Sequence, residues 1–178
     1  AEKAAYSVFV VNYSRLAVKI AAGQPGDWPA YQPYGREASR TDRVVQPPGR
    51  RVFDDEIRVN LEPDQLGEVQ IDLSQVMDGP YGHYVVIVNP PGEKDPWRAV
   101  QTWVQATQIG LDAIVDHSTL IAWASALKDG APLSGVVIQA NPGGAQAVTG
   151  ADGLARLAIP SGAAILVASL GEDQALLP

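Results

Sequence analysis

Cysteine is absent from the 178-residue sequence, and histidine occurs only as His83 and His117. The lack of cysteine excludes disulfides, thiol nucleophiles and thiolate metal sites. A zinc site needs three or four converging ligands, and these two histidines lie in different halves of the chain. We therefore expect His83 to be a strand-end residue, His117 to be a turn residue, and the chain to hold no metal and no cofactor.

Long apolar runs are also missing. No run approaches the ~20 residues that a membrane-spanning helix requires, and no basic segment followed by an apolar one opens the chain. The sequence begins AEKAAYSV, without an initiator methionine. From this beginning we expect an excised fragment or a processed protein.

Charge is sparse and of mixed sign. Only 19% of the residues are charged, and the 20 acidic and 13 basic residues give a net charge of −7. Nucleic acids and anionic membranes demand a basic stripe, which this scattered acidic balance does not supply. With 46% apolar residues, the chain has enough apolar surface to bury real cores.

The dominant hydrophobic period is two, which is typical of β-strands that bury one face. Leu16, Val18 and Ile20 alternate with charged or small residues, whereas 84–88 is apolar on both faces. Strands are expected near 5–12, 15–22, 51–54, 56–61, 68–74, 82–89, 102–109, 111–116, 119–127, 135–140, 145–149, 154–159 and 163–170. The pattern predicts an all-β fold of two consecutive antiparallel β-sandwich domains, immunoglobulin-like or fibronectin type III-like.

The segment PPGEKDPWR concentrates proline, glycine and charge between two strand-like regions. It predicts a linker and a boundary near residue 97, with domains at 1–97 and 98–178. Residues 1–98 hold 11 basic and 14 acidic residues against 2 and 6 in 99–178, so the surface chemistry also changes here. Trp97 and Trp103 flank the boundary. We expect them either to pack between the domains or to lie in the core or rim of their own domain.

Two Asp-Gly pairs punctuate the second half, Asp152-Gly153 in TGADGLARLAIPSG and Asp129-Gly130 in KDGAP. Asp-Gly occurs in catalytic and cation-binding loops as well as in turns. Asp152 has no second acid at ligand spacing and no histidine near it in sequence. We expect it to bond its own backbone while Gly153 takes a positive φ, between the strands at 145–149 and 154–159.

The long excursion over 23–50 contains GQPGDWPAYQPYG, in which Trp28, Tyr31 and Tyr34 lie among prolines. An aromatic, proline-rich loop of this kind either offers a flat platform to a peptide or sugar, or folds its rings back over its own domain. Both readings stay open from the sequence.

No catalytic set is apparent. The run Asp54-Asp55-Glu56 lacks the alternate spacing of a calcium loop and is expected to be a solvated turn. No glycine-rich phosphate loop precedes a helix, and no Gly-x-Ser-x-Gly elbow occurs. Since no nucleophile, base and orienting group can be assembled, the sequence does not predict an enzyme.

The second half carries specific motifs. The run TWVQATQIGLDAIVDHSTLIAWASALKDGAPLSGVVIQA is followed by TGADGLARLAIP and by GEDQALLP. In the blocks 102–111, 127–138 and 149–157 it resembles a macroglobulin-like domain of the bacterial α2-macroglobulins. In the first half, NYSRLAVKIAAGQPGDWPAY and IDLSQVMDGPYGHYVVIVNPP resemble the preceding macroglobulin-like domain, while the middle of that half matches poorly.

The resemblance implies a piece of a large, periplasmic, usually lipid-anchored protease inhibitor of broad specificity. In that family a protease cleaves an exposed bait segment, the domains rearrange, and the protease is trapped, often through a Cys-Gln thioester. Because this chain has no cysteine, it contains neither the thioester nor the lipidated residue. The expected role is non-catalytic scaffold. The expected partners are other domains of the parent chain and, through the full-length protein, target proteases.

Two alternatives of other classes remain. A tandem β-sandwich adhesin or surface stalk would also lack chemistry, but the two halves do not align as repeats. A carbohydrate-binding accessory module would need an exposed line of aromatic rings, which only the Trp28–Tyr34 segment offers.

Overall fold

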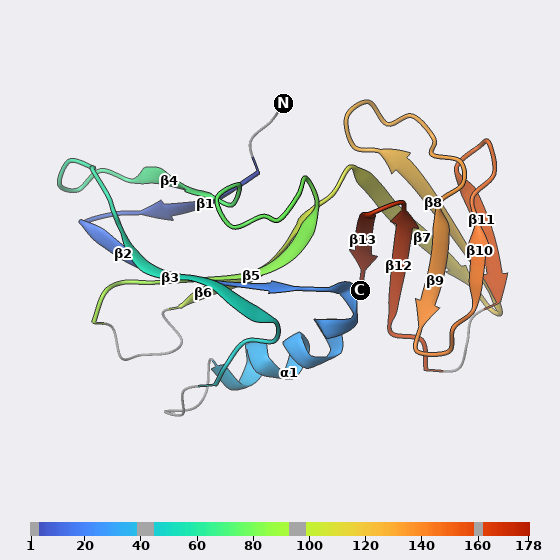
Figure 1. The fold of residues 1–178 in the computed structure, drawn as a ribbon, viewed down its shortest axis with the longest axis horizontal. Coiled ribbons are helices and arrows are strands. Elements are labelled where there is room, and N and C mark those ends of the chain that lie inside the picture. Colours follow the sequence, from blue (N-terminus) through green and yellow to red (C-terminus); the bar gives the residue numbers. More distant parts are fainter. Residues whose placement is uncertain (1–3, 39–44, 93–98, 159–161) are drawn as a thin grey trace. The chain divides into compact units, whose positions relative to one another are not determined.

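The computed structural model describes residues 4–38, 45–92, 99–158 and 162–178 (Figure 1). It divides into two compact units, Ala1–Val104 and Gln105–Pro178. The predicted boundary at residue 97, Trp97 and most of the predicted linker lie outside the described residues. No helix in the described part of the chain is both long enough and apolar enough to cross a membrane.

The first unit contains two antiparallel sheets (Figure 1). The smaller sheet pairs β1 (Ala5–Val10) with β4 (Gly67–Asp72). The larger sheet has the order β3 (Arg50–Arg58), β2 (Arg15–Gly23), β5 (Gly82–Asn89) and β6 (Val100–Ala106). As the alternation predicts, Leu16, Val18 and Ile20 are buried, and the apolar strand β5 is buried along most of its length.

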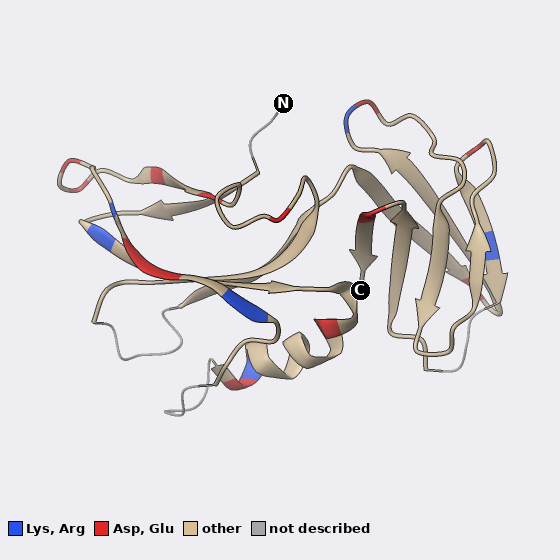
Figure 2. Cartoon of the chain, viewed as in Figure 1, with Lys and Arg blue, Asp and Glu red and all other residues tan. Residues whose placement is uncertain are grey.

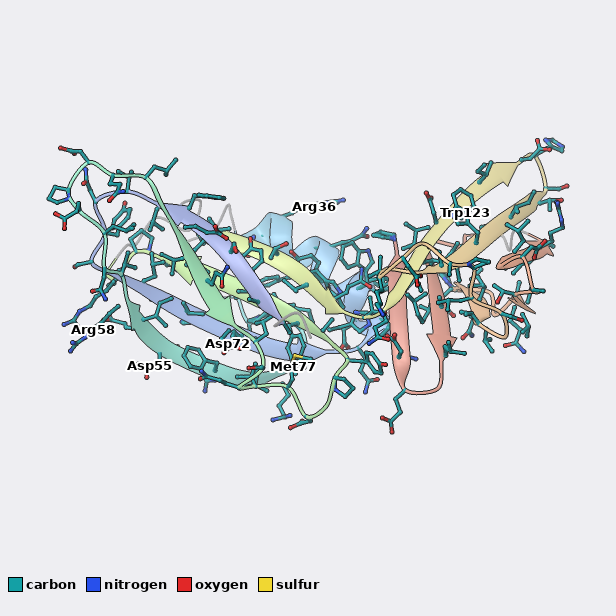
Figure 3. All side chains as sticks on the ribbon, turned by 90° about the horizontal axis from the view of Figure 1, so that it is seen from above. Arg36, Asp55, Arg58, Asp72, Met77 and Trp123 are labelled. Atoms are coloured by element: carbon teal, nitrogen blue, oxygen red, sulfur yellow. The ribbon has the colours of Figure 1, made fainter. Side chains whose placement is uncertain are left out.

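Two details of the first unit differ from the sequence prediction. The expected strands at 51–54 and 56–61 form one strand, β3, so Asp54-Asp55-Glu56 is not a turn. β3 lies at the edge of its sheet, where charged side chains remain in water and discourage pairing with other chains. Figure 2 shows charge gathered on this strand, and Figure 3 shows Asp55 and Arg58 projecting outward from it.

The predicted loop over 23–50 contains helices instead. A 3₁₀ turn, η1 (Pro25–Asp27), leads into the α-helix α1 (Trp28–Ala38). The Asp27 carboxylate accepts a hydrogen bond from the Gln24 N–H at 2.9 Å, and Pro25 occupies the first turn, where its fixed φ suits a helix. The part of the predicted loop at 39–44 lies outside the described residues.

The second unit is a sandwich of two antiparallel sheets (Figure 1). One sheet has the order β10 (Gln146–Val148), β9 (Val137–Asn141), β12 (Ile165–Leu170) and β13 (Asp173–Leu177). The other has the order β11 (Leu154–Ala158), β8 (Thr119–Ala126) and β7 (Ile109–Asp116). Their inner faces share one apolar core that includes Ile109, Leu120, Val136, Ile138 and Leu166.

The strand content confirms the prediction of an all-β chain built from antiparallel sheets. The sequence places a strand at 102–109 in the second half, but β6 belongs to the sheet of the first unit, where it neighbours β5. The closing strand β13 is missing from the sequence prediction. It begins with Asp173, a buried acidic residue that interrupts the apolar pattern.

Candidate functional site

The aromatic residues expected in a surface loop lie instead on the helix α1, in the first unit. Their spacing of three residues puts Trp28, Tyr31 and Tyr34 on one side of the helix. Trp103 of β6 stacks edge-on against Trp28, with 5.4 Å between ring centroids and 82° between planes, and lies 5.4 Å from Tyr31. These four rings, called here the aromatic cluster, pack α1 onto the larger sheet.

Trp103 and Tyr34 of the aromatic cluster turn their polar groups into the first unit, and Trp28 Nε1 is buried there without a hydrogen-bond partner. The Trp103 Nε1–H donates to Nδ1 of the buried His83 at 3.2 Å, so that nitrogen is an acceptor in the folded unit. Tyr34 is buried against Ala21, Val85 and Ile87. This burial, helped by the nearby Tyr31, raises the pKa of Tyr34 to about 12.

From the sequence, these aromatic residues are expected either to form a binding platform or to fold back over their own domain, and the aromatic cluster distinguishes the two. A loop platform is not present, since the segment is helical and its rings contact one another and the sheet. Trp103 packs within the first unit.

His117, the other histidine, lies exposed in the turn between β7 and β8. The described residues contain no group of three or more His, Asp or Glu side chains placed to hold a metal ion.

The turn at Asp152-Gly153 joins strands of different sheets, since β10 pairs with β9 and β11 pairs with β8. It is therefore not the expected hairpin. The Asp152 carboxylate accepts from the Leu154 N–H at 3.0 Å, and Gly153 has φ +74°. The Gly153 carbonyl accepts from the Ala124 N–H at 2.9 Å, so the turn backbone lies directly against β8.

The turn at Asp129-Gly130 has the same local chemistry with open surroundings. The Asp129 carboxylate accepts from the Ala131 N–H at 3.0 Å, and Gly130 also has φ +74°. A Cβ added at Gly130 would meet nothing within 4 Å, whereas one at Gly153 would lie 2.6 Å from the Ala124 oxygen. Both aspartates are occupied by their own turns.

Thr149, the first residue of the TGADG block, is a buried polar side chain that sequence reasoning passed over. Its hydroxyl donates to the Leu133 carbonyl at 2.6 Å and accepts from the Val136 N–H at 3.0 Å. These two hydrogen bonds join the segment 133–136, which precedes β9, to the residue at which the Asp152 turn begins. Its place in a recognisable motif is the signal that identifies it.

Asp173 is a second buried polar residue that the sequence analysis missed. One carboxylate oxygen accepts from the Thr107 hydroxyl at 2.6 Å, and the other accepts from the Gln108 N–H at 2.9 Å. The Gln105 side-chain amide both donates to and accepts from the backbone of Leu176 on β13. These side chains hold the outer edge of β13 from within the second unit.

These contacts stabilise the fold of each unit. Among the described residues they do not bring together a nucleophile, a base and an orienting group. No protein-family model matches the chain, and no curated protein matches its sequence. Solved structures do match. Native α2-macroglobulin from Escherichia coli spanning domains NIE-MG1 aligns with TM-score 0.72 and 21% identity over 96% of this chain and 86% of that one. The chain has the fold of a bacterial α2-macroglobulin segment.

Two other Escherichia coli structures support the same α2-macroglobulin fold. Trypsin-activated α2-macroglobulin aligns with TM-score 0.70 and 20% identity over 96% of this chain and 12% of that one. The structure spanning domains MG0-NIE-MG1 aligns with TM-score 0.68 and 21% identity over 96% of this chain. This chain spans 57% of that three-domain structure. The resemblance inferred from the motifs is thus confirmed at the level of the fold.

Proposed function

We propose that the chain is a non-catalytic scaffold segment of a bacterial α2-macroglobulin, a protease inhibitor of broad specificity. The observation that carries the proposal is the match of both units, in chain order, to one two-domain structure. The alignment leaves only a small part of either chain uncovered, 96% of this one and 86% of the other being matched. The motif resemblance in the second half supports the same family independently.

The first unit corresponds in this proposal to the domain named NIE and the second to the domain named MG1. The difference in coverage supports the assignment, because the chain fills 86% of the NIE-MG1 structure and 57% of the structure that adds MG0. The second unit is then the macroglobulin-like domain that the sequence motifs indicate. The first unit also carries a helix packed on its larger sheet.

A scaffold role agrees with how the polar side chains are used. In the part of the chain that the structure describes, the buried polar residues are Asp173, Thr149 and His83, and each hydrogen-bonds within its own unit. A catalytic acid or base needs to reach a substrate. A side chain that is buried and engaged in the fold instead fixes strand ends and loops.

The parent protein, in the same proposal, faces the periplasm and is attached to the membrane by a lipid outside this segment. Its partners are the other domains of the parent chain and, through the whole molecule, target proteases. The carbohydrate-binding alternative loses its supporting feature, because the rings of the aromatic cluster contact one another and the sheet.

Reading the gene on both sides of this segment tests the assignment. We expect further domains downstream, a lipid-attachment cysteine upstream and a Cys-x-x-Gln thioester sequence downstream. A gene that codes for residues 1–178 alone would contradict the proposal. A longer gene whose flanks code for repeats of the same two units would favour the surface-stalk alternative.

A further inference from the structure

An apolar groove of about 280 Å³ opens between the smaller sheet of the first unit and the ends of β5 and β6. Consecutive residues from Val8 to Val11 line one wall, and Val88, Asn89 and Val100 line the other. No lining residue carries a charge. An occupant of this groove is therefore apolar and uncharged where it touches the walls.

Large hydrophobic side chains around the groove are exposed. The exposed fraction is 68% for Phe9, 42% for Val11 and 49% for Val100. Single exposed hydrophobic residues are ordinary on protein surfaces. Several around one groove offer apolar area that another segment can cover. Covering them removes apolar area from water, which is favourable.

One wall of the groove is an unpaired strand edge. Among the described residues, β4 is the only strand that pairs with β1. The Ala4 carbonyl accepts from the Leu73 N–H, and Ala5 lies opposite Asp72. Backbone hydrogen bonds alternate along an antiparallel pair, so the N–H and C=O groups of Ser7 and Phe9 point away from β4.

The groove thus combines an apolar surface with a free strand edge. An extended peptide segment suits both, because its backbone pairs with the edge while alternate side chains cover the apolar walls.

We propose that the groove binds an extended, uncharged, apolar segment of the parent chain that lies outside residues 1–178. The segment adds to the free edge of β1 as a third strand. This rests on the proposed function, which supplies neighbouring domains. The matched three-domain structure extends beyond the 57% of it that this chain covers, and a parent chain of that kind would supply the segment. A third strand also steadies a two-stranded sheet, which is marginal alone.

Thiol labelling tests the proposal, because residues 1–178 contain no cysteine. Val100→Cys places a thiol in the groove, and Val148→Cys places a control thiol on β10, where the exposed fraction is 60%. Each variant is made in the 178-residue chain and in the longer product of the same gene. Peptide mass spectrometry measures labelling at each site, and circular dichroism checks the fold. Val11→Cys is the second groove variant should Val100→Cys fail to fold.

In the longer product we expect labelling of Val100→Cys to slow by about tenfold or more, because the thiol reacts only when the added strand opens. Val148→Cys should label at the same rate in both products. Equal labelling of Val100→Cys in both products would overturn the proposal. Protection that appears in the 178-residue chain as its concentration rises would identify a second copy of the chain as the occupant and overturn the proposal. Protection that appears only after a protease is added would identify the protease as the occupant and overturn it as well.

Protease inhibition by the longer product separates this proposal from the proposed function. Absence of inhibition with the groove still protected would count against the proposed function alone.

Discussion

Gly153 and Gly130 adopt the same backbone conformation in different surroundings. Both have φ +74°, a region that residues with a Cβ enter at a cost. Only Gly153 lies against a neighbouring strand, with its hypothetical Cβ 2.6 Å from the Ala124 oxygen. Turn chemistry at these positions is local, which is why the Asp-Gly sequence suggests it without a structure.

Gly130→Val should lower the free energy of unfolding by roughly 1–2 kcal/mol, the usual cost of a left-handed backbone in a residue with a side chain. Gly153→Val should lower it clearly further, because the new side chain also collides with β8. Urea unfolding of the two variants measures the difference. Asp152→Asn is the control and should unfold as the parent does, since an Asn oxygen can accept the same Leu154 N–H. Equal losses at the two glycines would contradict the close approach to β8.

Thr149 shows what turn chemistry does not reveal. Its hydroxyl hydrogen-bonds to the Leu133 carbonyl and the Val136 N–H. These groups lie beside Thr149 only because the folded sheets bring the two segments together. Asp173 likewise meets Thr107, which is 66 positions away in sequence. No spacing rule marks such buried polar contacts, although both residues lie within the motifs quoted from the sequence.

Thr149→Val should destabilise the second unit by about 1–3 kcal/mol for each backbone group left without its partner. Thr149→Ser keeps the hydroxyl and should cost only about 1 kcal/mol for the lost methyl group. Thermal unfolding of the two variants provides the comparison. If serine and valine destabilised equally, the hydroxyl would not be the stabilising feature.

At the scale of elements, period-two alternation predicts most strands of the second unit, because each buries one face in a shared core. Helix α1 escapes prediction, since prolines and aromatic rings are poor helix formers. Its stability comes from packing on the larger sheet through Trp28, Tyr31 and Tyr34. The spacing of three residues between these rings was the available signal. The sequence assigns the strand at 102–109 to the second half, because a proline-rich segment separates it from β5. In the structure this strand, β6, neighbours β5 in the sheet of the first unit.

The docking of α1 should weaken at alkaline pH. The pKa of Tyr34 is raised from 10.0 to about 12, so the folded unit holds the phenol proton more tightly than the unfolded chain does. The stabilisation is therefore complete below pH 10 and is lost as the pH rises towards 12. Circular dichroism melts across this range should show a smaller loss for Tyr34→Phe than for the parent chain.

Tyr13→Phe is the matched control for Tyr34→Phe, because Tyr13 is exposed. This variant should follow the parent chain at every pH. A Tyr34→Phe chain that lost stability between pH 10 and 12 as steeply as the parent would show that the buried phenol is not responsible.

At the scale of the molecule, the chain consists of two β-rich units whose order and fold follow those of a bacterial α2-macroglobulin segment. The motif blocks of the second half were sufficient to suggest this from the sequence. The first unit was harder to interpret, because its charged edge strand and its helix follow neither the alternation nor the motifs. Protease inhibition belongs to the whole parent protein in this account.

Inhibition of trypsin by the full-length gene product tests the central claim most directly. Trypsin is incubated with an excess of the full-length protein, and the remaining hydrolysis of a large protein substrate is measured. The 178-residue chain, which lacks a thioester cysteine, serves as the control. The account predicts loss of trypsin activity with the full-length protein and none with the chain alone. Full trypsin activity in both samples would contradict it.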